Sequence, residues 1–196
     1  MAEPEDHALM LAVRAGDSAP LAELFARHHR SLFHYFRKLG YRRSDSEDLV
    51  QDTFMRILKY AHSYNADGHF SAWLYRVARN SARDTWQPQA AMQEEVTEDS
   101  AIAPRHYEPT AIASGHDEQA LLQRALMRLP RDRRELILLS RVKELSHEDL
   151  AALFDCNVNA IKVRLHRSLA QLLEYFQQAK GEHERPFRTI QSVEAK

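Results

Sequence analysis

Apolar residues recur every three or four positions along two long blocks of this chain, which is the period of an amphipathic α-helix. In the first block, of about 85 residues, the clearest series is Leu21, Leu24, Phe25, Leu32, Phe36 and Leu39. The pattern Ser44-x-x-Glu47 predicts a capping box at the start of a further helix, and the block carries no strand signal. The spacing therefore predicts an all-α fold.

Helical periodicity is lost between the two blocks. Residues 87–118 contain 7 Asp+Glu against 1 Arg, a net charge of −6, whereas residues 119–196 carry a net charge of +4. A proline-containing segment of acidic and small residues without a sustained apolar stripe is expected to be mostly disordered on its own, and the blocks around it suit polyanion binding. We predict two small helical domains joined by a flexible acidic linker, with bounds 1–86 for the N-terminal bundle, 87–117 for the linker, 118–179 for the C-terminal bundle and 180–196 for a flexible tail.

The scarcity of glycine and cysteine excludes several kinds of enzyme site. The chain has 5 glycines, too widely spaced for a dinucleotide fingerprint or a Walker phosphate loop. Cys156 is the only cysteine, which excludes internal disulfides and cysteine-based zinc sites. The 11 histidines form no His-Glu-x-x-His motif. We therefore expect no catalytic residue, no metal and no cofactor, and the chain is not predicted to be an enzyme.

The location of the protein follows from two further features of the sequence. The apolar runs are far shorter than the roughly 18 residues that cross a bilayer. The first residues, Met1 to Asp6, are acidic and lack the apolar stretch of a secretory signal. We expect a cytoplasmic protein without membrane insertion.

The most specific local pattern is a pair of short helices joined by a turn of about three residues, which is helix-turn-helix spacing. Ser146 and Asp149 form a capping box for the first helix, and Asn157 can cap the second. The outward face of the second helix carries Asn159, Lys162, Val163, His166 and Arg167. Arg and Asn side chains make bidentate contacts to guanine and adenine, and an α-helix fits the major groove. We interpret this face as a DNA-reading surface; the alternative is a solvated face on an interaction helix.

A second basic pattern lies on the helix predicted over residues 70–86. Arg76, Arg79 and Arg83 are spaced i, i+3, i+7 and share one face, with Asn80 beside them. Aromatic residues are interleaved, and Tyr64 lies on the polar loop that precedes the helix. Cations that contact the backbone and rings that stack under bases suit single-stranded nucleic acid.

The aromatic residues near these arginines have two interpretations. They can stack on exposed bases, or they can fill the core while the arginines are solvated. A place in the core is favoured for Phe70 and Trp73. For Tyr64, on a polar loop, the two interpretations are equally supported.

Three segments together resemble a known family. They are Glu47-Asp-Leu-Val-Gln-Asp-Thr-Phe54, Phe70-Ser-Ala-Trp-Leu-Tyr-Arg-Val-Ala-Arg-Asn80, and Leu129-Pro-Arg-Asp-Arg-Arg-Glu135 ahead of the helix-turn-helix. In this order and across a variable linker, they resemble the extracytoplasmic-function (ECF) sigma factors of bacterial RNA polymerase. The resemblance covers about residues 9–86 and 119–176.

By position, the resemblance implies a role for each group of residues. A helix would dock on the clamp helices of the largest polymerase subunits through Asp48, Gln51, Asp52 and Phe54. Tyr64, Asn80 and the loop between them would meet the promoter −10 element, where this family opens DNA and captures an unpaired base. The acidic linker resembles the segment that runs through the polymerase cleft in this family.

The same resemblance places Lys162, His166 and Arg167 at the −35 element. Asp155 stands where the turn commonly has glycine, so a left-handed backbone there costs more. Ala160 and Val163 replace hydroxyl residues common on the recognition helix. The expected partners are core RNA polymerase, promoter DNA and an anti-sigma factor. The alternative function is a stand-alone helix-turn-helix transcriptional regulator, which binds duplex DNA unaided.

Overall fold

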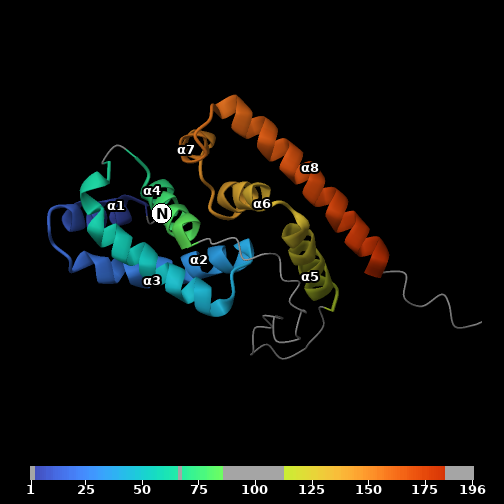
Figure 1. Ribbon diagram of the computed structural model, residues 1–196, viewed down its shortest axis with the longest axis horizontal. Helices are drawn as coiled ribbons and strands as arrows, with labels where there is room; N and C mark the ends of the chain where they lie inside the picture. The colour runs from blue at the N-terminus through green and yellow to red at the C-terminus, as the bar shows by residue number, and fades with distance from the viewer. Residues whose placement is uncertain (1–2, 66–67, 86–112, 184–196) are drawn as a thin grey trace, which may run out of the picture.

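The computed structural model describes residues 3–65, 68–85 and 113–183, and these ranges contain helices and no strand. The first half of the chain forms α1 (Glu3–Arg14), α2 (Pro20–Leu39), α3 (Arg43–Lys59), the 3₁₀ turn η1 (Ala61–Ser63) and α4 (Phe70–Thr85). The second half forms α5 (Ala113–Arg128), α6 (Arg131–Ile137), the π-helical turn η3 (Leu138–Val142), α7 (His147–Leu153) and α8 (Val158–His183). The predicted all-α class is confirmed (Figure 1).

The helices can be compared with the bounds predicted for the two bundles. The first four lie within residues 1–86. α5 begins at Ala113, inside the segment predicted as linker, and α8 continues to His183, past the predicted start of the tail. The rest of the predicted linker and tail, residues 86–112 and 184–196, lies outside the described residues.

Gly40 ends α2 in a left-handed conformation, with φ of 101°. Its N–H donates to the carbonyl oxygen of Arg37 at 3.0 Å. Only glycine adopts this φ without steric cost. A Cβ here would also lie 3.1 Å from both Arg134 Nη1 and Met127 Cε, so the second half of the chain closes against this position.

The predicted capping box at Ser44 is wrong. The N-cap of α3 is Arg42, two residues before Ser44, and no side chain caps the first turn of the helix. Glu47 instead accepts a hydrogen bond from Arg43 Nε at 3.0 Å, because residues four apart share one face of a helix. Asp45, in the first turn, is placed to favour the positive end of the helix dipole.

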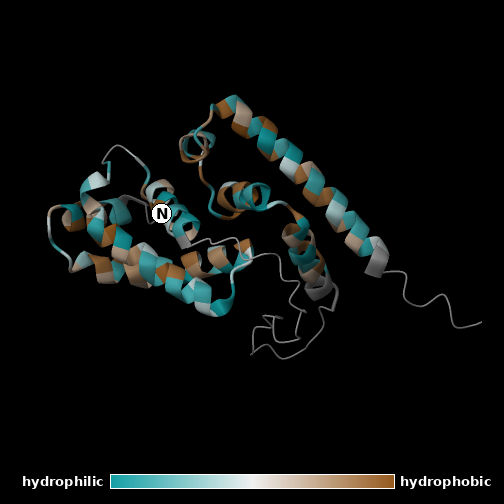
Figure 2. Cartoon of the chain, in the orientation of Figure 1, coloured by the Kyte–Doolittle hydropathy of each residue, from teal (hydrophilic) through white to brown (hydrophobic). Residues whose placement is uncertain are grey.

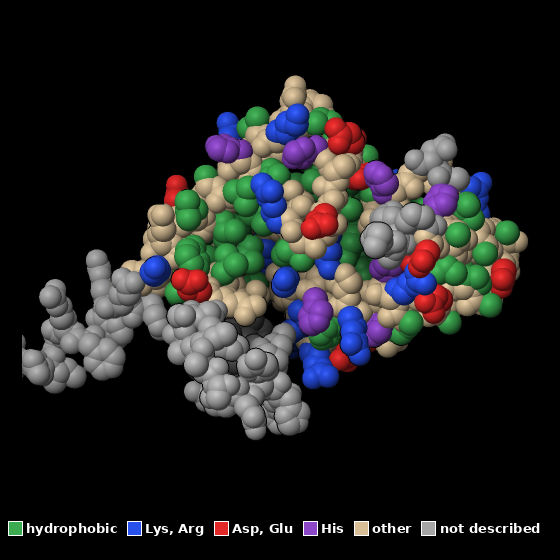
Figure 3. All heavy atoms as spheres, turned by 180° about the vertical axis from the view of Figure 1, so that it is seen from behind, with side chains coloured by type: hydrophobic (Ala, Val, Ile, Leu, Met, Phe, Trp, Pro, Cys, Tyr) green, Lys and Arg blue, Asp and Glu red, His purple; other side chains and the backbone are tan. Residues whose placement is uncertain are grey.

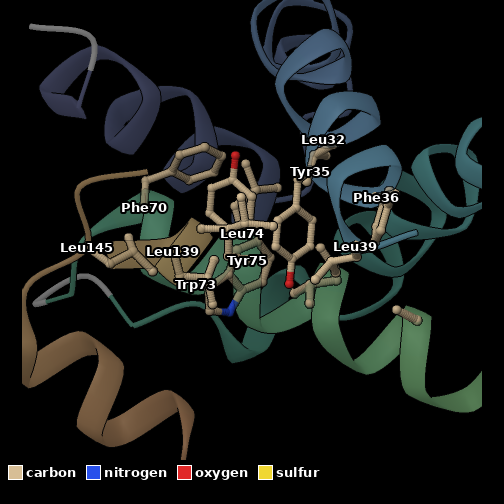
Figure 4. Close-up of a cluster of buried hydrophobic side chains, with 14 of the residues drawn as sticks. Leu32, Tyr35, Phe36, Leu39, Phe70, Trp73, Leu74, Tyr75, Leu139 and Leu145 are labelled. Atoms are coloured by element: carbon tan, nitrogen blue, oxygen red, sulfur yellow. The ribbon is translucent and has the colours of Figure 1, made fainter. Parts of the chain in front are cut away.

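The two halves share one hydrophobic core. In the first half it lies between the four helices, where the fully buried side chains include Met10, Leu24, Leu32, Tyr35, Phe36, Ile57 and Leu74. Leu139 of η3 and Leu145 belong to the same buried cluster and lie beside Phe70 and Tyr75 in the close-up view (Figure 4). Burial of apolar surface between the halves therefore stabilises their packing against each other.

The helix α8 lies on the outer side of the second half, with α6 and α7 between it and α4 (Figure 1). Hydrophobic and hydrophilic residues alternate along its length (Figure 2). Ile161 and Leu165 are buried against the neighbouring helices. The polar stripe of the same turns therefore faces away from the body of the protein.

Candidate nucleic-acid and polymerase interfaces

The helix-turn-helix has both of the caps that its sequence predicts. Ser146 Oγ accepts a hydrogen bond from the N–H of Asp149 at 3.0 Å, at the start of α7. Asn157 Oδ1 accepts one from the N–H of Ala160 at 2.8 Å, at the start of α8. These bonds satisfy backbone donors that the first helical turn leaves unpaired. They fix where α8 begins and therefore which side chains it presents.

The five residues proposed to read DNA are all exposed. Leu150 and Ala151 of α7 are buried against Ile161 and Leu165 of α8, which fixes the rotation of α8. The exposed side chains on its opposite face are Asn159, Lys162, Val163, His166 and Arg167. From behind, Lys, Arg and His side chains are seen at the end of the molecule where α7 meets α8 (Figure 3). This end offers cationic and hydrogen-bonding groups on a convex helix, as major-groove reading requires.

Asp155, in the turn of this motif, has a φ of 50°, the left-handed conformation that an L-residue adopts at a cost. We expect Asp155→Gly to raise the free energy of unfolding by about 0.5–1 kcal/mol, since removal of the Cβ relieves the strain and outweighs the added freedom of the unfolded chain. Asp155→Ala should lower it. Urea denaturation of the full chain measures both effects. A glycine variant less stable than the wild type would contradict the claim that the backbone at Asp155 is strained.

The basic face of α4 is partly exposed and partly covered by the second half of the chain. Arg76, Asn80 and Arg83 are exposed. The side chain of Arg79 is only 14% exposed, and its Nε donates to Glu135 Oε2 at 3.2 Å. Three of the four α4 residues proposed for the −10 element are thus accessible, and the fourth lies against α6.

Tyr64 lies in the core and is not on an open loop. Its side chain is 2% exposed, and its ring lies edge-on to that of Trp73 with centroids 5.2 Å apart. Its hydroxyl is 2.8 Å from His7 Nδ1 of α1. The predicted stacking of Tyr64 on a DNA base is therefore incompatible with this packing. The placement of Phe70 and Trp73 in the core is confirmed.

The α3 residues proposed to bind polymerase fall into an exposed pair and a pair that packs within the protein. Asp48 and Gln51 are exposed. Asp52 accepts hydrogen bonds from Arg56 Nε, at 2.8 Å, and from Ser81 of α4, so it ties α3 to α4. Phe54 is 6% exposed and packs edge-on against Phe25, because it lies on the inward stripe of α3. A direct contact with polymerase is therefore open to Asp48 and Gln51 but not to the Phe54 ring.

A groove of about 530 Å³ lies between α2 and α3. Its lining residues are Phe25, His29, Arg30, Phe33, His34, Arg43, Glu47, Val50 and Gln51. Phe25 is 40% exposed and stacks on His29, with ring centroids 5.0 Å apart. The sequence placed Phe25 in an inward stripe and missed this position, which lies at the edge of that stripe.

The described residues hold no group of three His, Cys, Asp or Glu side chains placed to bind a metal ion. In the same part of the chain, no helix combines the length and apolar character needed to span a membrane.

Comparison with known proteins matches both halves to one family. Residues 24–91 match the model for Sigma-70 region 2, and residues 119–172 match that for Sigma-70, region 4. The ECF RNA polymerase sigma factor SigM of Mycobacterium tuberculosis is 31% identical over 177 residues, covering 88% of this chain and 87% of SigM. RNA polymerase sigma factor CnrH of Cupriavidus metallidurans is 28% identical over 179 residues, covering 86% and 94%.

Two solved structures have a similar fold. CnrH in complex with the cytosolic domain of CnrY aligns with a TM-score of 0.65 at 25% identity, covering 88% of this chain and 97% of CnrH. The sigma factor RpoE of Bartonella quintana, in complex with the anti-sigma factor NepR, aligns with a TM-score of 0.60 at 25% identity, covering 80% and 96%. With matches to regions 2 and 4 in order along the chain, the protein belongs to the ECF RNA polymerase sigma factors.

Proposed function

We propose that the chain binds core RNA polymerase and directs promoter-specific transcription initiation in the cytoplasm. The observation that carries this proposal is the exposed cationic face of α8 on a doubly capped helix-turn-helix, in one chain with a region 2 domain. None of the matches favours the stand-alone regulator. We propose no catalytic step for the chain itself, because polymerase supplies the chemistry of RNA synthesis.

The −10 element would be bound by the α4 face. Arg76 and Arg83 are exposed there and carry positive charge to the DNA backbone, while Asn80 can hydrogen-bond to a base edge. Arg79 lies on the same face and would join them once its contacts with α6, Leu153 and Phe154 are released. Tyr64 supports this site from inside the core.

Polymerase would be bound by the surface of α2 and α3 around the groove. Asp48 and Gln51 present polar groups there, and Phe25 adds an exposed apolar ring. Aromatic residues, Phe among them, are enriched in protein interfaces relative to the rest of the surface. Phe54 and Asp52 hold this surface in shape.

Two side chains of α8, Arg167 and Lys162, are expected to make different contributions to binding of the −35 element. Arg167→Ala should weaken discrimination at one base pair by about 1–3 kcal/mol if the guanidinium reads a base edge. Lys162→Ala should lower affinity evenly across sequences and reduce the salt slope by about one unit if the amine contacts a phosphate. Holoenzyme binding to promoters mutated at −35 measures both effects. Unchanged footprints in both variants would contradict the assignment.

A titration on duplex promoter DNA, at near-physiological salt and with or without core polymerase, tests the proposed function. The acidic segment between the halves repels DNA, so we expect weak binding by the chain alone and tight, sequence-specific binding with core enzyme. Tight specific binding without polymerase would contradict the proposal.

We also propose an anti-sigma factor as a partner. CnrH and RpoE, the two structural neighbours, were solved in complex with CnrY and with the anti-sigma factor NepR, respectively. Co-purification of the full chain from its host, with identification of stoichiometric partners, tests this.

A further inference from the structure

Glu135 of α6 is a buried carboxylate that joins the two halves of the chain. It is 4% exposed. Its Oε1 accepts a hydrogen bond from the Tyr35 hydroxyl at 2.7 Å, and its Oε2 accepts one from Arg79 Nε at 3.2 Å. Burial, together with the nearby carboxylate, raises the pKa of Tyr35, so its hydroxyl stays protonated and can donate. Both partners of Glu135 thus lie in the first half.

Two further contacts join the Arg79 guanidinium to the second half. Its Nη1 donates to the carbonyl oxygen of Leu153 at 2.5 Å. Its carbon lies 4.2 Å from the centroid of the Phe154 ring, a cation–π contact. A carboxylate, a carbonyl and a ring therefore surround a guanidinium on the proposed −10 face of α4.

Other polar contacts hold the same interface closed. Lys143 Nζ donates to Ser31 Oγ at 2.5 Å and to the Ser31 carbonyl oxygen at 3.2 Å. Burial, with a contribution from Lys38, lowers the pKa of Lys143 to about 8, as expected for an amine withdrawn from water. At the edge, His69 Nδ1 lies 3.0 Å from Asp149 Oδ2. With Leu139 and Leu145 in the shared core, these contacts make the closed arrangement a packed one.

We propose that the free chain is closed by this interface and that Glu135 takes, on Arg79, the place that a DNA phosphate takes in the promoter complex. The inference rests on the proposed role of the α4 face in binding the −10 element. Carboxylate and phosphate are both anions that accept charge-assisted hydrogen bonds from a guanidinium. In the closed state the Nε and Nη1 donors of Arg79 are bonded to Glu135 and to the Leu153 carbonyl, so a phosphate that takes these donors must displace the second half. Closure and −10 binding therefore compete, and the second half must leave α4 before DNA is bound.

The test compares Glu135→Gln with the wild type and with Glu174→Gln. The glutamine keeps the shape of the buried side chain but leaves the Arg79 charge unpaired, which destabilises the closed state. Glu174 is exposed on α8, so its variant makes the same charge change away from the interface. Lys143→Met is a second opening variant that leaves both Glu135 and Arg79 in place, and thermal melts establish that each variant is folded.

Two measurements are made on the full chain. Spin labels on cysteines introduced at the exposed positions Met55 and Leu173, with Cys156 replaced by serine, report the distance between the halves. Fluorescence anisotropy with a 12-nucleotide single-stranded DNA of mixed sequence reports binding to the α4 face. If the closed state holds about nine-tenths of the population, opening raises the apparent affinity about tenfold.

We expect Glu135→Gln and Lys143→Met to add longer label distances and to bind the oligonucleotide about tenfold more tightly, with Glu174→Gln unchanged in distance. Adding Arg79→Ala to Glu135→Gln should remove the gain in affinity but not the longer distances. Unchanged distances in both opening variants would overturn the closed state, and longer distances without a gain in affinity would overturn the competition. A wild-type chain that fails to direct transcription by core polymerase would instead contradict the proposed function. The distance measurement does not require polymerase, so the two failures can be told apart.

Discussion

Arg134→Ala is expected to lower the free energy of unfolding by about 3 kcal/mol or more, the largest stability effect among the variants considered. The guanidinium is buried in α6 and donates hydrogen bonds of 2.7–3.0 Å to four carbonyl oxygens. The acceptors belong to Leu39, Leu126, Met127 and Leu129. Three of them lie at the end of α5, where the last carbonyls of a helix lack their usual intrahelical donors. The Leu126 oxygen also accepts a hydrogen bond from the N–H of Leu129. Each buried acceptor without a donor costs about 1–3 kcal/mol.

Thermal unfolding of the full chain measures this effect, with a decrease in Tm of roughly 10 °C expected for a chain of this size. Arg133→Ala is the matched control because Arg133 is exposed. Arg134→Lys should not restore stability, since one ammonium cannot reach four carbonyls that a planar guanidinium reaches. A Tm for Arg134→Ala equal to that of Arg133→Ala would show that the four bonds contribute little.

Asp48→Arg is expected to weaken binding to core polymerase at least about tenfold while leaving the thermal stability unchanged. Asp48 is exposed on α3, and reversing a charge within an interface places like charges together, which costs several kcal/mol. Co-purification and competition for core enzyme measure the loss. Glu174→Arg makes the same change of charge on α8 and serves as the control. If Asp48→Arg and Glu174→Arg compete equally well for core enzyme, the docking surface does not include Asp48 of α3.

Asp52→Arg should give a different result from Asp48→Arg. Its carboxylate accepts hydrogen bonds from Arg56 and from Ser81, so the variant loses the link between α3 and α4. We expect a lower Tm together with weaker polymerase binding. The two aspartates lie one turn apart on the same helix. Asp48 is expected to contact polymerase, whereas Asp52 is expected to stabilise the packing of α3 on α4.

Local signals in the sequence were sufficient to predict the helix-turn-helix. Ser146 and Asn157 each cap a helix from within a few residues, and the apolar spacing gives the rotation of α8. Its exposed face was predicted correctly for the same reason. The capping box at Ser44 failed because a local pattern does not exclude a helix that begins two residues earlier.

Contacts between distant residues could not be predicted in this way. The spacing of Arg76, Arg79 and Arg83 identifies one face of a helix, but it does not say that α6 covers Arg79. Glu135 and Tyr35 are 100 positions apart, so no local pattern joins them. The one available signal was the placement of two charged residues, at 134 and 135, directly before an apolar run.

Run-off transcription tests the central claim most directly. Core RNA polymerase is supplied with genomic promoter fragments from the host, with and without the full chain, and Asp48→Arg is included as a docking-deficient variant. We predict transcripts with defined start sites that appear only when the wild-type chain is present and are lost with Asp48→Arg. Transcription that is the same with and without the chain would contradict its assignment as a promoter-directing sigma factor.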